Sequence, residues 1–179
     1  MKFTTVLPAA GLVVTLALGA ASQKFSTAIQ SINLVATTFS NLDQQIGRVN
    51  ENNVGNEGRA IAEGLNDIVQ VLSKEDQTFT GAEDPEPFRD SDQQLVIDGV
   101  DSLVDAARGM LETLMDKQGL AAEYILSEGI IQGIRQLRTA SEQYVGYVIA
   151  LAPKDEDQGN EAYDNLDIYF EAALQTYES

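Results

Sequence analysis

The chain offers few of the side chains that usually carry catalysis or bind metals. Its 179 residues include no histidine and no cysteine, which removes the usual general base, thiol nucleophiles and the commonest metal ligand. A serine triad cannot be completed without histidine, and no Gly-x-Ser-x-Gly turn occurs. Paired carboxylates can cleave glycosidic bonds, but nearly all the acidic residues lie opposite an apolar stripe or in a connecting segment. We therefore expect no enzymatic activity and no cofactor.

The most concentrated group of acids follows Lys154. A calcium loop needs glycine at its sixth position and a bidentate acid at its twelfth. Counting from Asp155, Gly159 is fifth and Leu166 is twelfth. We interpret this segment as a solvated acidic turn and expect no metal site.

The formal net charge of -17 restricts the class of partner. A strongly acidic surface repels phosphate backbones, so we expect no nucleic-acid partner. It also disfavours electrostatic docking on anionic membranes. The charge is typical of a protein that stays soluble through self-repulsion.

The first 21 residues have the order of a secretory signal peptide. Lys2 supplies a positive start, residues 6–18 are mostly apolar, and small residues follow at 19–21. The apolar run is too short for a transmembrane helix, and we expect no transmembrane segment. We predict cleavage after Ala21, with cleavage after Gly19 as the alternative, leaving residues 22–179 as a single helical-bundle domain. The C-terminus has no hydrophobic tail, so we expect a secreted, extracellular protein without a GPI anchor.

Apolar periodicity predicts an all-α fold, an up-and-down bundle of about five amphipathic helices. The expected helices cover residues 22–49, 57–74, 91–119, 120–152 with an interruption near Ser127, and 160–177. The first carries an unbroken heptad seam. This seam consists of Ala28, Ile32, Val35, Phe39, Leu42, Ile46 and Val49. Ser91 and Gln94 fit a capping box at the start of the third helix.

The segment 75–90 is the longest expected connector. Pro85 and Pro87 cannot both lie inside a helix. An irregular connector offers less burial, so we expect Phe79 and Phe88 to be exposed and to make first contact with a hydrophobic surface.

Two glycines one turn apart, Gly129 and Gly133, lie in the fourth expected helix. They favour close approach of a neighbouring helix; the alternative is a gap that admits a ligand chain. If such a gap exists, the apolar periodicity of the helices predicts four further residues that line it: Leu103, Leu111, Leu137 and Tyr144.

Three features of the chain resemble the fungal hydrophobic surface-binding protein A family, which includes the domains of cell wall galactomannoproteins. An export signal leads directly into the long heptad helix at residues 25–32. A central helical pair follows, with residues 98–104 in its second member. The last helix ends in the aliphatic, alanine and tyrosine pattern of residues 166–177. The lack of cysteine agrees with this.

The resemblance implies a non-catalytic extracellular bundle that adsorbs to hydrophobic surfaces, helps to bring esterases to them, or binds fatty acids between its helices. The serine- and threonine-rich stalk of wall-attached members is missing, so the resemblance gives cell-wall association only as an alternative. We expect a monomer whose partners are a hydrophobic surface or lipid and an extracellular esterase. The alternative function is a secreted protein-interaction module or effector with no lipid ligand.

Overall fold

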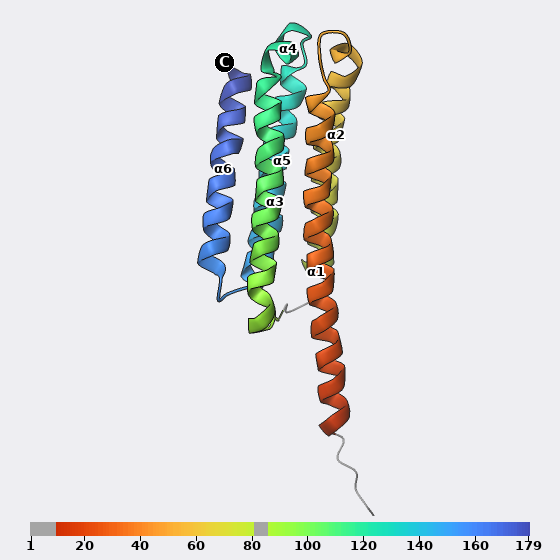
Figure 1. Ribbon diagram of the computed structural model, residues 1–179, viewed down its shortest axis with the longest axis vertical. Helices are drawn as coiled ribbons and strands as arrows, with labels where there is room; N and C mark the ends of the chain where they lie inside the picture. The colour runs from red at the N-terminus through yellow and green to blue at the C-terminus, as the bar shows by residue number, and fades with distance from the viewer. Residues whose placement is uncertain (1–9, 81–85) are drawn as a thin grey trace, which may run out of the picture.

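The computed structural model describes the backbone of residues 10–80 and 86–179, with side chains described outside residues 10–23, 56 and 78–80. Six helices account for most of this part of the chain (Figure 1). They are α1 (Ala10–Gly47), α2 (Val54–Thr80), α3 (Asp90–Asp116), α4 (Gln118–Glu123), α5 (Ser127–Ala150) and α6 (Glu156–Glu178). The prediction of an all-α up-and-down bundle is confirmed.

The long helices alternate in direction along the chain, with α1, α3 and α6 running one way and α2 and α5 the other (Figure 1). In space they form a ring in which α1 packs on α2, α2 on α5, α5 on α6, α6 on α3, and α3 on α1. Three of these five neighbouring pairs are therefore parallel. The first turns of α1 extend beyond the other helices (Figure 1).

The apolar stripes meet inside this ring as one core cluster. All seven residues of the heptad seam, six on α1 and Val49 just after it, are buried, which confirms the predicted face. The stripes of α2, α3 and α5 are likewise buried, as are four of the five residues on the apolar stripe of α6, which are Ala162, Leu166, Phe170, Ala173 and Tyr177. The remaining α6 residue, Ala162, is half-buried against the same core.

The predicted break near Ser127 is present, and it separates α4 from α5. The amide of Leu126 donates to the carbonyl of Ala121 at 2.9 Å, and the amide of Ile125 donates to that of Ala122 at 3.3 Å. This is the Schellman arrangement, which requires a left-handed residue at the position of Ile125. Ile125 has φ 58°, so a β-branched residue occupies a conformation that glycine normally takes.

Two expectations about helix ends are wrong. Helix α2 continues to Thr80, beyond the predicted end at residue 74. Helix α3 begins at Asp90 with no side-chain cap, and Ser91 donates instead to Asp92. The buried Gln93 ties down this end, because it donates to the Phe88 carbonyl at 2.8 Å and accepts from the Lys154 amide at 2.8 Å.

Candidate functional site

Ser31, Ser141 and Tyr144 place hydroxyl groups in the mostly apolar interior of the bundle. Oγ of Ser31 and the phenol oxygen of Tyr144 share a hydrogen bond of 2.8 Å, and these side chains are 2 % and 1 % exposed. Oγ of Ser141 is buried and has no hydrogen-bond partner among the described residues. A buried hydroxyl without a partner is unfavourable, so Ser141 is a group that a polar ligand atom could satisfy.

The helix geometry explains why these groups gather in the interior. Ser141 and Tyr144 are three residues apart on α5 and therefore share a face. Ser31 precedes Ile32 of the heptad seam on α1. Because α1 and α5 are not neighbours in the ring, the bond between Ser31 and Tyr144 spans the interior.

The environment of Tyr144 keeps its phenol neutral. Burial raises the pKa of Tyr144, the hydrogen bond with Ser31 partly lowers it, and the Glu75 carboxylate raises it further. The phenol therefore remains a hydrogen-bond donor at any ordinary pH. Such a donor inside an apolar core suits the oxygen atoms of an otherwise apolar ligand.

The structure brings four predicted wall residues to this core. Leu103 and Leu111 extend from α3, and Leu137 and Tyr144 from α5, into the same cluster. The three leucines have no surface accessible to water. The core around them is therefore closed in this structure, and a chain that entered it would have to separate side chains now in contact.

Gly129 and Gly133 of α5 face α2. A Cβ on Gly133 would lie 2.8 Å from Cδ1 of Leu65, and a Cβ on Gly129 would lie 3.6 Å from Cβ of Ala62. Leu65 thus fills the space that Gly133 leaves, and the interpretation as a ligand gap is wrong at this position. The glycines allow α2 and α5 to approach closely instead.

The structure tests the expected exposure of only one of the two aromatic residues, Phe79 and Phe88. Phe88 is only 8 % exposed, so its expected exposure is wrong. Its amide donates to the Leu151 carbonyl at 2.8 Å, and its ring packs edge-on against Phe25 with centroids 6.4 Å apart. These contacts hold the segment before α3 against the bundle. The Phe79 side chain lies outside the described residues.

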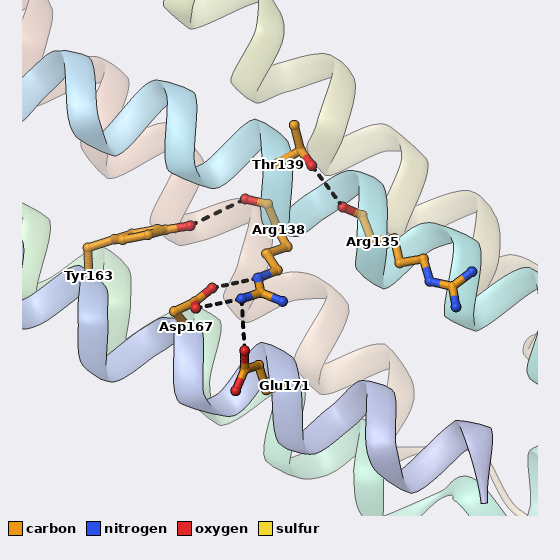
Figure 2. A network of polar contacts seen from close by, with 6 residues as sticks. All are labelled: Arg135, Arg138, Thr139, Tyr163, Asp167 and Glu171. Carbon is orange, nitrogen blue, oxygen red and sulfur yellow. Dashed lines mark hydrogen bonds and ion pairs between the residues drawn. The ribbon is translucent and has the colours of Figure 1, made fainter.

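Sequence reasoning missed a polar network between α5 and α6 (Figure 2). Arg138 donates two hydrogen bonds of 2.6 Å to the carboxylate of Asp167 and one of 3.1 Å to Glu171. The Asp167 hydrogen bond is the main reason that the pKa of Arg138 is raised. The signal in the sequence is the i, i+4 spacing of the two acids, which places both on one side of α6.

This network borders an open groove of about 570 Å³ that also includes Tyr163 and Glu142. The phenol of Tyr163 donates to the Arg138 carbonyl at 3.4 Å. Arg138 pairs with two carboxylates, and Arg135, which also lines the groove, pairs with Glu178 at 2.7 Å, so both arginines of the groove are already paired. We interpret the network as a set of structural contacts that hold α5 and α6 together.

Neither a metal site nor a membrane-spanning helix is found in the described part of the chain. Among residues 10–80 and 86–179, no acidic side chains gather in a group that could hold a metal ion. No helix within the same ranges is long and apolar enough to cross a membrane.

Comparisons with known proteins bear on the fold. No protein-family model matches the chain, and no curated protein matches its sequence significantly. Among solved structures, AfMP4p in complex with palmitic acid is similar with a TM-score of 0.77 and 12% identity, over 86% of this chain and 99% of that one.

Two domains of the Penicillium marneffei MP1 protein are also similar, each with a TM-score of 0.59. Ligand binding domain 2, complexed with multiple arachidonic acids, is 17% identical over 88% of this chain and 94% of that one. Ligand binding domain 1, complexed with arachidonic acids, is 11% identical over 84% of this chain and 98% of that one. At these identities the likeness shows a shared helical fold.

Proposed function

We propose that this chain is a secreted, non-catalytic protein that binds long-chain fatty acids between the helices of its bundle. In this proposal residues 1–21 are a signal peptide and residues 22–179 form the mature extracellular protein. The interior hydroxyls of Ser31, Ser141 and Tyr144 contact the carboxyl group, and the leucines around them contact the acyl chain.

The unpaired hydroxyl of Ser141 is the observation that carries the proposal. It lies in an apolar core, on the same face of α5 as Tyr144, whose hydroxyl bonds across the interior to Ser31. Polar groups in a core are normally satisfied, and a carboxyl oxygen would satisfy this one. The shared fold with proteins solved in complex with palmitic and arachidonic acids supports the same ligand class.

Binding requires the closed core to open. Each buried methylene contributes about 0.8 kcal/mol, so a long acyl chain can offset the separation of side chains that it causes. Because the apolar stripes are continuous along the helices, an acyl chain would replace one set of apolar contacts by another.

Titration with a fluorescent fatty acid tests the proposal. We expect saturable binding at micromolar protein, and Tyr144→Phe should weaken it by about tenfold, which corresponds to one hydrogen bond to a charged group. The matched control is Tyr177→Phe. This change also removes a buried phenol, but one that donates to the Leu114 carbonyl at 2.7 Å, and the affinity should stay within about twofold of wild type. Absence of saturable binding would favour the protein-interaction alternative.

We further propose that the protein adsorbs to hydrophobic surfaces and there helps to recruit extracellular esterases. The most exposed large apolar side chains, Ile125 and Ile168, supply apolar contact on the surface of this acidic protein. Because apolar burial drives adsorption, salt should leave it unchanged or strengthen it by screening repulsion between bound molecules. Depletion of protein by hydrophobic beads at low and high salt measures this, and co-depletion of an added esterase tests recruitment. Loss of adsorption as salt rises would contradict the proposal.

A further inference from the structure

An open groove of about 340 Å³ lies between α1 and α3. Its apolar lining comes from Phe25, Ile29 and Ile32 on α1 and from Leu95 on α3. Leu95 is 54 % exposed, so a large apolar side chain stands on its rim without cover from the described residues. The volume falls within the range of small-molecule sites, roughly 300–1,000 Å³.

Gly99 shapes the α3 side of this groove. A Cβ at this position would lie 3.3 Å from Cγ2 of Ile32 and 3.9 Å from Cδ1 of Ile29. Glycine therefore lets the backbone of α3 approach α1 closely and leaves a shallow floor between the two helices. At the other end of the lining, the ring of Phe25 is held edge-on by Phe88.

Three of the described residues that line the groove carry polar groups. They are the amide of Asn33, the hydroxyl of Ser102 and the carboxylate of Asp98. Asp98 is the only ionisable residue among the described residues that line the groove. Its Oδ1 accepts from Gln94 at 2.9 Å, and Ser102 donates to its backbone carbonyl at 2.9 Å.

A carboxylate accepts hydrogen bonds and cannot donate them. It therefore attracts a head group with an O–H donor and repels an anionic one. A fatty-acid anion in this groove would place two negative charges together, whereas a hydroxyl can donate to Asp98 and accept from the Asn33 amide.

We propose that the α1–α3 groove binds an uncharged single-chain lipid with a hydroxylated head group, such as a monoacylglycerol. The acyl chain lies against Phe25, Ile29 and Leu95, and the hydroxyl donates to Asp98. This site is separate from the core site for fatty acids and does not depend on it.

Calorimetric titration with monopalmitoylglycerol and with palmitate, which share one acyl chain, tests the proposal. Leu95→Asp places a charge on the apolar rim and should raise the Kd for monopalmitoylglycerol about tenfold or more. It should leave palmitate binding at the core unchanged. Leu34→Asp is the matched control, because Leu34 is 49 % exposed on α1 and is not among the groove residues. Equal affinity of wild type and Leu95→Asp for monopalmitoylglycerol would overturn the proposal.

A second variant tests the role of the Asp98 charge in excluding anionic head groups. Asp98→Asn removes the repulsion of anions and should add a second equivalent of bound palmitate, which native mass spectrometry counts directly. Asp116→Asn, an exposed change near the other end of α3, should not alter the count. If Asp98→Asn binds palmitate as wild type does, the assigned head-group selectivity is wrong. If only the proposed fatty-acid site in the core is wrong, the wild type should bind no palmitate, but Leu95→Asp should still weaken the binding of monopalmitoylglycerol.

Discussion

At the scale of single residues, the centre of the α1 seam gives the most direct test of packing. Phe39 has no accessible surface. Phe39→Ala should lower the free energy of unfolding by about 3–5 kcal/mol, because it removes buried apolar surface and leaves a cavity. Urea denaturation measures the loss. Asn41→Ala, at an exposed position of α1, should change stability by less than about 0.5 kcal/mol. A Phe39→Ala variant as stable as wild type would contradict the observed face.

At Ile125 we expect the opposite effect, a substitution that stabilises the protein. It is 92 % exposed and has φ 58°, a conformation that costs a side chain with a Cβ about 1–2 kcal/mol. Ile125→Gly should therefore raise the free energy of unfolding by about 1 kcal/mol. Ile168→Gly, at an exposed position inside α6, should lower it by about 1 kcal/mol. Destabilisation by Ile125→Gly in the same denaturation series would show that its side chain stabilises the turn.

At the scale of helices, Gly129 and Gly133 of α5 distinguish an ordinary contact from tight packing. A Cβ on Gly133 would overlap Leu65, whereas one on Gly129 would make an ordinary contact with Ala62. Gly133→Ala should destabilise the protein by about 1–3 kcal/mol because α2 and α5 must shift apart. Gly129→Ala should stabilise it by up to about 1 kcal/mol, since alanine favours the helix. Thermal unfolding of both variants decides, and shifts of equal sign would contradict this difference in packing.

The sequence predicted the helices and their buried faces because both follow from local periodicity. The seam from Ala28 to Val49 repeats every three or four residues, and every member is buried. Helix ends were less predictable because they depend on distant partners. Gln93 secures the start of α3 through the Lys154 amide, 61 residues away, and a capping pattern at Ser91 carries no information about that contact.

At the scale of the whole molecule, the sequence indicated the alternating directions of the helices but not their order around the ring. Short connections place consecutive helices antiparallel, yet they do not decide that α3 lies between α1 and α6. The hydroxyl pair of Ser31 and Tyr144 depends on that order, because 113 residues separate its members. Apolar period alone identified Tyr144 as a wall residue, and only the packed ring gives its phenol a partner across the core.

The buried phenols predict how the whole fold responds to alkali. Burial is the largest cause that raises the pKa of both Tyr144 and Tyr177 above the ordinary value, which is about 10. Since the folded state favours the neutral phenol, its contribution to stability is fully present below about pH 10 and is lost as pH rises above that value. Urea denaturation between about pH 8 and about pH 11 should therefore show a falling free energy of unfolding. The double variant Tyr144→Phe and Tyr177→Phe has no phenol to ionise at these positions, so it should be less stable at the lower pH but lose stability less steeply. Equal slopes for variant and wild type would mean that repulsion among the acidic residues, rather than the buried phenols, governs alkaline unfolding.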